Sequence, residues 1–269
     1  MSVNYRAYFG LKSDPFATDV ATKDLLRLPG MLGVKERLDY VVSLGGVLVV
    51  TGEVGAGKST SLRWSLSHYH PSEVAVVSVV ANTGSIVELL RMISWGLDLN
   101  PTTMSKSKLF ADAKAAVRDI AGAKKQKVAL VIDEANLLRV DVLLELHTLL
   151  YFDHDSKSLL SLVLCGQSTV LDRLAYRTVA PLASRVIARA HLETLPLAQM
   201  EDYLAHHVKI AGGKKALFDP PAITAIHQGS GGVLRRANAL ARGGLLAAQR
   251  EEKDAVTAEH IRIASSELM

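Results

Sequence analysis

The most constraining feature of the sequence is a glycine-rich stretch that directly follows a short apolar run. Residues Gly52–Ser59 read Gly-Glu-Val-Gly-Ala-Gly-Lys-Ser, and the apolar run before them is Val47–Thr51. This pattern, placed between a strand and a helix, lets successive backbone N–H groups converge on an anion. The helix N-terminus adds the positive end of its dipole. The alternative is a glycine-rich turn without a ligand, but the flanking strand and helix favour a phosphate-binding loop.

Each part of this loop has a chemical task in a nucleotide site. The Lys58 ammonium group is expected to contact the β- and γ-phosphates, and the Ser59 hydroxyl is a ligand for Mg²⁺. We therefore expect ATP and Mg²⁺ as cofactors. The loop residues expected to contact the nucleotide are Gly52, Glu53, Val54, Gly55, Ala56, Gly57, Lys58, Ser59 and Thr60.

Short apolar runs alternate with helical patterns through the first two thirds of the chain. Apolar runs that lack polar alternation are typical of parallel strands covered by helices on both faces, so the pattern predicts an α/β fold. The expected strands are Val47–Thr51, Val74–Val80, Val128–Ile132, Leu159–Cys165 and Arg185–Leu192. The expected helices between them are Ser59–Tyr69, Ser85–Leu97, Leu109–Ala123 and Val140–Phe152.

The pattern changes after Pro196, where helical stretches follow one another without a strand candidate. These stretches are Leu197–Ala211, Pro220–Gly229, Leu234–Gln249 and Thr257–Leu268. We therefore expect three parts: an irregular segment 1–40 that packs on the core, a nucleotide-binding core 41–195 and a helical lid 196–269.

Polar residues follow three of the predicted strands. Asp133 and Glu134 end the run Val128–Ile132, at the sheet edge where the phosphate loop is also expected. Asp133 is predicted to hold Mg²⁺ through water, and Glu134 to act as general base on the attacking water. Gln167 is expected to hydrogen-bond the γ-phosphate or that water, or else to be a turn residue. Asn82 either hydrogen-bonds Glu134 or forms a turn beside a glycine.

Two arginines are candidates for stabilising charge on the nucleotide. Arg185 lies between a helix end and the last strand, where it would reach the nucleotide of a neighbouring subunit more easily than its own. Arg235 and Arg236 begin a lid helix. One of them could sense the nucleotide from the lid, whereas a solvated face is the preferred interpretation for Arg236.

Taken together, these motifs resemble the AAA+ ATPases of the ExeA type (general secretion pathway protein A). The similar segments, in the family's order, are Tyr8–Phe16, Thr51–Lys58, Ile132–Ala135, Leu164–Gln167, Ser184–Arg189 and Gly232–Arg235. The resemblance implies a P-loop NTPase core with a five-stranded parallel sheet in the order 5-1-4-3-2, followed by a helical lid. It also implies a homo-oligomer, ring or filament, with ATP between subunits. Gln167 takes the sensor-1 place, Arg185 the arginine-finger place and Arg235 the sensor-2 place.

The chain departs from this family in several respects. Asn136 replaces the usual glutamine, and Leu234 replaces the proline before the lid arginine. Family members that work in secretion continue into a membrane helix and a peptidoglycan-binding region, for which this sequence shows no counterpart. It therefore looks more like the transposition ATPases related to the Mu B protein and TniB, which bind DNA when loaded with ATP and recruit or activate a transposase.

Positive charge is concentrated in one segment. The whole chain carries 31 Lys and Arg against 27 Asp and Glu, whereas residues 102–127 carry seven basic and two acidic residues. Such a segment, repeated in an oligomer, is suited to a DNA backbone without sequence specificity, although it is also typical of a solvated helix face. The candidate DNA contacts are Lys106, Lys108, Lys114, Arg118, Lys124 and Lys125.

Composition excludes other classes of protein. A single cysteine, Cys165, excludes an internal disulfide framework and fits a reducing compartment. No apolar run approaches the ~20 residues of a membrane helix, so we expect a cytoplasmic protein without membrane insertion. The expected function is an ATP-hydrolysing AAA+ protein that acts as a DNA-binding regulator of a transposase. The alternatives are an ATPase for assembly of a secretion or pilus apparatus through protein partners, and a nucleotide-gated switch with little turnover.

Overall fold

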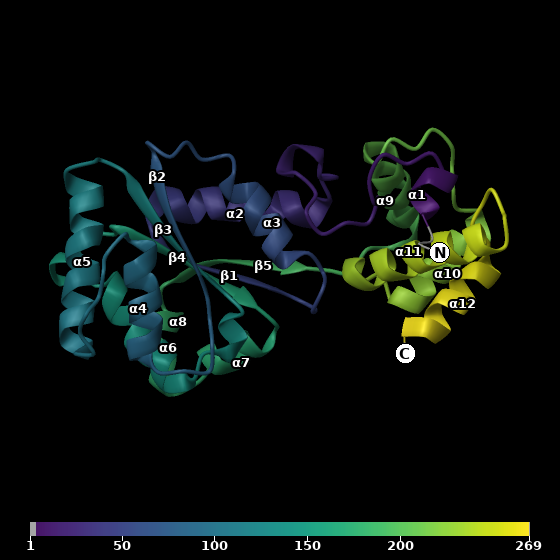
Figure 1. Ribbon diagram of the computed structural model, residues 1–269. Coiled ribbons are helices and arrows are strands. Elements are labelled where there is room, and N and C mark those ends of the chain that lie inside the picture. Colours follow the sequence, from purple (N-terminus) through teal and green to yellow (C-terminus); the bar gives the residue numbers. More distant parts are fainter. Residues whose placement is uncertain (1–3, 269) are drawn as a thin grey trace. The chain divides into compact units, whose positions relative to one another are not determined.

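The structure is a computed structural model that describes residues 4–268, and the chain divides into two compact units. The sheet unit comprises Leu28–Gly52 and Lys58–Leu192. The helical unit comprises residues 4–27, Glu53–Gly57 and residues 193–268. Figure 1 shows the elements of each unit.

The sheet unit contains one five-stranded sheet in which all strands are parallel. Its order, β2-β3-β4-β1-β5, confirms the order 5-1-4-3-2 that the family resemblance implies. The strands are β1 (Gly46–Gly52), β2 (Val74–Val80), β3 (Lys127–Asp133), β4 (Leu160–Gly166) and β5 (Val186–Leu192).

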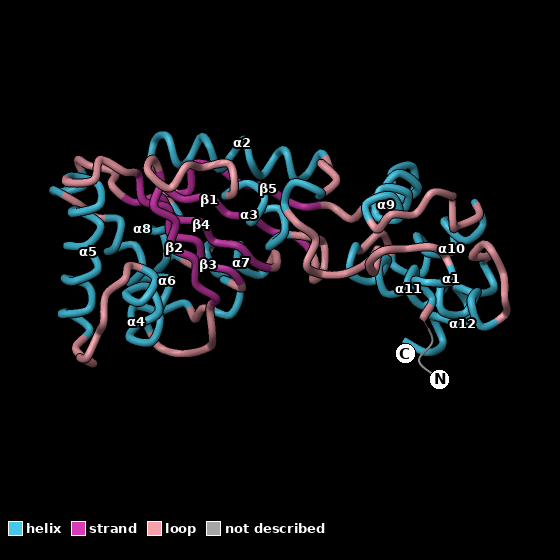
Figure 2. The backbone as a smooth tube through the Cα atoms, turned by 45° about the horizontal axis from the view of Figure 1, so that its top comes forward, coloured by secondary structure: helices cyan, strands magenta, loops and turns pink. Residues whose placement is uncertain are grey.

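Helices cover both faces of this sheet, and its inner strands β1 and β4 are therefore buried along almost their whole length. One layer contains α2 (Pro29–Leu44) and α3 (Lys58–Leu66), and Figure 2 shows the sheet between this layer and the other helices. The second layer contains α4 (Ile86–Gly96), α5 (Lys106–Gly122), α6 (Val140–Leu146), α7 (Thr169–Leu174) and α8 (Ala180–Ala183). The central strand β1 is completely buried over Val47–Val50.

Short 3-10 turns connect several of these elements: η1 (Thr22–Asp24), η2 (Ala135–Leu137), η3 (His147–Leu150), η4 (Asp153–Asp155) and η5 (Arg177–Val179). The predicted helix Val140–Phe152 is therefore shorter in the structure, because α6 passes into η3. The turn η4 follows, and its three residues all have positive φ values of 46–67°. Three successive residues other than glycine in the left-handed region form a strained connection before β4.

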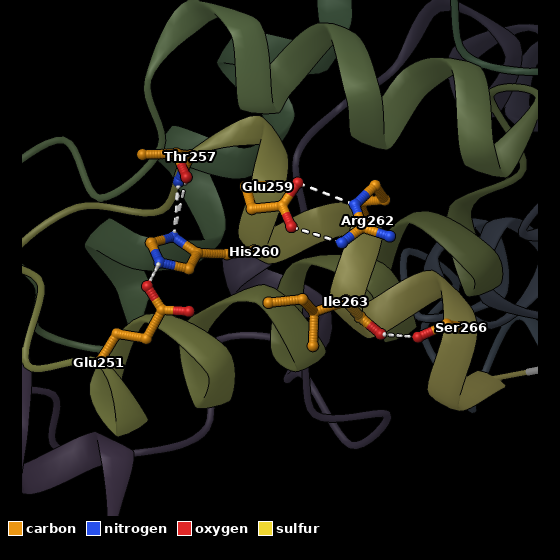
Figure 3. A network of polar contacts seen from close by, with 7 residues as sticks. All are labelled: Glu251, Thr257, Glu259, His260, Arg262, Ile263 and Ser266. Atoms are coloured by element: carbon orange, nitrogen blue, oxygen red, sulfur yellow. Dashed lines mark hydrogen bonds and ion pairs between the residues drawn. The ribbon is translucent and has the colours of Figure 1, made fainter.

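The helical unit is built from α1 (Tyr5–Tyr8), α9 (Leu197–Ile210), α10 (Pro220–Ser230), α11 (Leu234–Arg250) and α12 (Ala258–Leu268). A polar network fixes the start of α12 (Figure 3). The N–H of Thr257 donates to Nδ1 of His260 at 2.9 Å, and Nε2 of the same ring lies 3.3 Å from the Glu251 carboxylate. The His260 side chain thus serves as the acceptor that satisfies a free N–H at the helix start.

The N-terminal segment differs from the expectation that residues 1–40 pack on the core. Residues 4–27 pack on the helical unit, whereas the following α2 covers the sheet. The N–H of Lys12 donates to the Ala211 carbonyl at 2.8 Å, and Nδ1 of His207 donates to the Pro15 carbonyl at 2.8 Å. Phe16 is 1% exposed and stacks on His207. Burial of this aromatic ring on α9 explains where the segment packs.

Candidate nucleotide-binding site

The phosphate loop connects β1 to α3 and uses backbone conformations that favour glycine. Gly55 and Gly57 have φ values of +86° and +93°. The Lys58 side chain is buried and its Nζ donates to the carbonyl oxygen of Gly52 at 3.0 Å. The lysine at the start of α3 therefore reaches back across the loop to its first residue. The ammonium group therefore lies beside the loop whose backbone N–H groups are expected to bind a phosphate chain.

The first carboxylate after β3 meets the serine of the phosphate loop. Oγ of Ser59 donates to Oδ2 of Asp133 at 2.6 Å, while Oδ1 of Asp133 accepts the N–H of Glu134 at 2.9 Å. Burial, and secondarily Asp133, raises the pKa of the neighbouring Cys165 thiol, which stays protonated. A hydroxyl and a carboxylate at one point form a hard oxygen donor set, so Ser59 and Asp133 fit Mg²⁺.

Glu134 has an unusual backbone conformation for its residue type. Its φ and ψ angles are 53° and 33°, in the left-handed region, and its carbonyl oxygen accepts the N–H of Leu137 at 2.8 Å. This conformation turns the chain sharply at the end of β3. It costs about 1–3 kcal/mol for residues other than glycine, and such strain concentrates at functional sites. The half-buried Glu134 thus follows directly on the carboxylate that contacts Ser59.

Gln167 follows β4 and is tied to the end of β3 by a residue that sequence reasoning missed. Its N–H donates to Oδ1 of Asn136 at 2.9 Å, and the Asn136 side chain is buried. A Cβ at Gly166 would lie 2.4 Å from the same Oδ1. The Asn136 side chain therefore connects the end of β4 to the segment after β3. A side chain at position 166 would clash with it, so glycine is required there. The signal in the sequence is the polar residue directly after Asp-Glu-Ala.

Asn82, at the end of β2, accepts the N–H of Gly84 through Oδ1 at 3.0 Å. Of the two roles considered for this residue, the structure therefore contains the turn.

Arg185 lies at the amino ends of the strands, whereas the phosphate loop follows the carboxyl end of β1. Its carbonyl oxygen accepts the N–H of Val47 at 2.9 Å, which places it at the amino end of β1. The seven residues of β1 separate it from the loop, a distance of about 20 Å at ~3.3 Å per residue. Its guanidinium group forms an ion pair with Asp155 at 2.8 Å. Arg185 is therefore not brought together with Lys58 of the same chain.

Arg235 lies within the helical unit, which also includes Glu53–Gly57. The N–H of Arg235 donates to the carbonyl oxygen of Gly55 at 3.1 Å. A Cβ at Gly55 would lie 2.7 Å from the Cβ of Arg235. The close backbone approach gives a second reason for glycine at this position of the loop. The side chains of Arg235 and Arg236 are both exposed.

The basic segment is largely engaged in contacts within the sheet unit. Lys106 pairs with Glu145 at 2.8 Å, Lys108 with Asp112 at 2.6 Å and Arg118 with Asp153 at 3.9 Å. Nζ of Lys114 donates to the Thr148 carbonyl at 3.2 Å, and burial, with a smaller effect of Arg118, lowers the pKa of this lysine. Lys124 and Lys125 are exposed at the turn before β3. Three of the six candidate DNA contacts therefore form ion pairs with carboxylates of this chain.

Comparisons with known proteins agree with this geometry. Residues 42–174 match a family model described as an AAA domain. General secretion pathway protein A of Aeromonas hydrophila is 30% identical over 250 residues, which cover 91% of this chain and 45% of that protein. The chain thus spans about half the length of this relative.

Solved structures share the fold at low sequence identity. The crystal structure of Cdc6p from Pyrobaculum aerophilum has a TM-score of 0.77 and 19% identity, over 96% of this chain and 72% of that one. The Aeropyrum pernix ORC1 protein in complex with DNA has a TM-score of 0.70 and 19% identity, over 94% and 68% of the two chains. Within residues 4–268, no helix is both long and apolar enough to cross a bilayer. The chain therefore contains an AAA domain and resembles general secretion pathway protein A over most of its length.

Proposed function

We propose that the protein binds and hydrolyses ATP. The observation that carries this proposal is the contact between Ser59 and Asp133, at the end of a phosphate loop closed by the bond from Lys58 to Gly52. The loop serine and the first carboxylate after β3 meet within hydrogen-bonding distance although they are 74 positions apart. This is the pair of oxygen donors that holds the metal in P-loop ATPases.

Each residue of the site has a proposed role. Lys58 and the loop N–H groups bind the phosphate chain, and Ser59 and Asp133 hold Mg²⁺, which when bound neutralises charge on the phosphates. The Glu134 carboxylate accepts a proton from the attacking water. Gln167, held by Asn136, is proposed to hydrogen-bond this water or the γ-phosphate.

Paired variants test hydrolysis and binding separately. Lys58→Ala is expected to abolish ATP binding, whereas Glu134→Gln should retain binding and lose phosphate release. Glu36→Gln, an exposed residue of α2, serves as the matched control and should change neither quantity. Retained ATP affinity in Lys58→Ala would show that the loop is misassigned. Unchanged phosphate release in Glu134→Gln would favour the nucleotide-gated switch over an ATPase.

We further propose that ATP is bound between subunits of a homo-oligomer and that Arg185 acts on the nucleotide of a neighbour. The position of Arg185 at the amino end of β1, away from the phosphate loop, supports action in trans. The guanidinium group is held by Asp155, so this role requires the ion pair to open when subunits meet. Arg235, whose backbone contacts the loop at Gly55, is the proposed contact from the helical unit.

We also propose that the protein binds duplex DNA in an ATP-dependent manner and regulates a transposase. Support for DNA comes from the fold shared with the DNA complex of Aeropyrum pernix ORC1 and from the exposed Lys124 and Lys125. The proposal that the partner is a transposase rests on the sequence resemblance alone. A filter-binding assay with duplex DNA should show higher affinity with ATP than without it, and Lys124→Glu with Lys125→Glu should weaken binding. Affinity that is independent of ATP would contradict the proposal.

The second candidate is an ATPase that energises assembly of a secretion or pilus apparatus through protein partners. It is favoured by the 30% identity with general secretion pathway protein A and by the pairing of Lys106, Lys108 and Arg118 with carboxylates. In this case duplex DNA should leave the rate of phosphate release unchanged.

A further inference from the structure

A group of exposed lysines lies on the helical unit where α9 ends. Lys12 comes from the N-terminal segment, Lys209 from the last turn of α9, and Lys214 and Lys215 from the loop that follows. Figure 1 shows the N-terminal segment beside α9 and this loop. We name these four residues the lysine cluster. None of them belongs to the proposed nucleotide site or to the basic segment 102–127.

Contacts around one glycine bring the members of the lysine cluster together. The N–H of Lys12 donates to the carbonyl oxygen of Ala211 at 2.8 Å, and the N–H of Gly212 donates to the carbonyl oxygen of Lys209 at 3.0 Å. Gly212 has a φ of +89°, and a Cβ at this position would lie 3.0 Å from Cγ of Lys12. The stem of Lys12 therefore lies on the turn that joins Lys209 to Lys214.

The two chain segments that meet at this turn carry positive charge only. Residues 4–13 contain two basic residues and residues 203–218 contain three, and neither segment contains Asp or Glu. Asp14, which directly follows the first segment, forms an ion pair with Arg242 at 2.8 Å. The carboxylate next to the cluster along the chain is therefore already neutralised.

The ammonium groups of the lysine cluster have no partners within the described part of the chain. Among residues 4–268, none of the four forms an ion pair or a side-chain hydrogen bond. The basic segment 102–127 differs, because Lys106, Lys108 and Arg118 pair with carboxylates. Of these two concentrations of positive charge, the lysine cluster is the one that is left for an external anion.

Helix electrostatics account for only one member of the cluster. A lysine in the last turn of a helix offsets the negative end of the helix dipole, which explains Lys209. This effect falls off within that turn, whereas Lys214 and Lys215 follow it in the loop. The backbone N–H groups of these two lysines also donate to no residue that the structure describes. The loop therefore offers both charged and neutral donors to an anion.

The composition of the cluster indicates the kind of anion. Lysine ammonium groups on flexible stems contact phosphates as point charges and need no fixed partner geometry. Lysine is depleted in the centres of protein interfaces, so four lysines without an apolar anchor favour a polyanion over a folded protein surface. Duplex DNA carries one negative charge per ~1.7 Å of helix axis, so several lysines can meet phosphates at the same time.

We propose that the lysine cluster binds the phosphate backbone of duplex DNA. The inference rests on the DNA binding proposed above and assigns part of that binding to the helical unit, in addition to Lys124 and Lys125 of the sheet unit. Contacts with phosphates carry no direct sequence information, so binding through the cluster is independent of DNA sequence. Because such contacts release counterions from DNA, the contribution of the cluster falls as salt increases.

The test measures the affinity of the full chain with ATP for a labelled duplex, by fluorescence anisotropy over about 50–200 mM salt. One chain combines four substitutions: Lys12→Gln, Lys209→Gln, Lys214→Gln and Lys215→Gln. The slope of log affinity against log salt should become smaller by about two to four, since each phosphate contact contributes about 0.9. The loss should be the same for duplexes of unrelated sequence.

A pair of double variants provides the matched comparison. Lys214→Gln with Lys215→Gln should lower the slope by about one to two, as expected for two phosphate contacts. Lys23→Gln with Lys253→Gln, at two exposed positions of the helical unit, should leave the slope unchanged. Circular dichroism and ATP affinity should be the same in all variants, because none of these residues belongs to the nucleotide site.

Three outcomes would overturn the proposal. If the fourfold variant binds the duplex with unchanged affinity and slope while Lys124→Glu with Lys125→Glu weakens binding, DNA binding stands and the lysine cluster has no part in it. If the unsubstituted chain binds no duplex, the proposed DNA binding fails together with this surface. If a glutamate peptide of equal charge binds the cluster more tightly than the duplex, the cluster belongs to an acidic protein partner.

Discussion

The hydroxyl of Ser59 lies 2.6 Å from the carboxylate of Asp133, so the start of α3 and the end of β3 meet at one point. Ser59 lies in α3, which follows β1, and Asp133 ends β3, although β4 lies between β1 and β3 in the sheet. The first prediction concerns this pair. Asp133→Asn should lower the affinity for ATP measured with Mg²⁺ and leave the affinity measured with EDTA unchanged, because the substitution removes a metal-binding charge. Isothermal titration calorimetry checks both values, and equal losses under the two conditions would contradict a metal role.

Arg185 provides the second prediction. Arg185→Ala should leave ATP binding intact and lower turnover by ~10³-fold if the guanidinium group acts in trans. Mixing this variant with Lys58→Ala should restore part of the activity, because each chain supplies what the other lacks. The measurement is phosphate release at varied mixing ratios. A mixture that stays inactive at every ratio argues against a shared site.

Asn136 gives a prediction about stability. Asn136→Ala leaves the N–H of Gln167 without its buried acceptor, which should lower the free energy of unfolding by about 1–3 kcal/mol. Urea denaturation measures the change. Asn82→Ala is the matched control, because its turn is exposed and its loss should cost less. A smaller cost for Asn136→Ala than for the control would show that the bond between the strand ends contributes little.

The buried side chain of His207 is expected to make the free energy of unfolding depend on pH. Burial lowers the pKa of this histidine in the folded chain, so the unfolded chain binds the proton more tightly. The stability associated with neutral His207 is therefore fully present above the unfolded pKa of about 6.5 and is lost as the pH falls toward the folded value. Denaturation curves between pH 7 and pH 5 should show a smaller decrease for His207→Gln than for the original chain. His70→Gln, at an exposed position, should retain the full decrease.

The sheet and the contact at the centre of the candidate site were predictable because their signals are local. An apolar run such as Val128–Ile132 identifies a covered strand, and residues that directly follow parallel strands gather at one edge. The family resemblance added the strand order, which the periodicity of the sequence does not contain. On this basis Ser59 and Asp133 are expected near each other, and their side chains lie within hydrogen-bonding distance in the structure, while their role in binding a nucleotide stays a prediction.

The features that sequence reasoning missed depend on contacts between distant residues. Lys106 is a candidate DNA contact from the sequence, but in the fold it forms an ion pair with Glu145 at 2.8 Å. The predicted helix through Phe152 ignored the left-handed turn at His154, for which no glycine gives a signal. Asn136 acquires its role only because Gly166 is folded against it. Periodicity identifies the apolar face of an element but does not say which residue lies opposite.

The packing of residues 4–27 on the helical unit has a consequence for synthesis. The carbonyl oxygen of Pro15 and the ring of His207 are 192 positions apart in the chain, whereas the sheet unit ends at Leu192. Ribosomes release the chain from its N-terminus, so nearly all of the sheet unit emerges before α9 exists. Residues 4–27 must therefore wait, with Phe16 uncovered, until α9 appears. The sheet unit is expected to fold first, and the helical unit closes only when both distant parts of the chain are available.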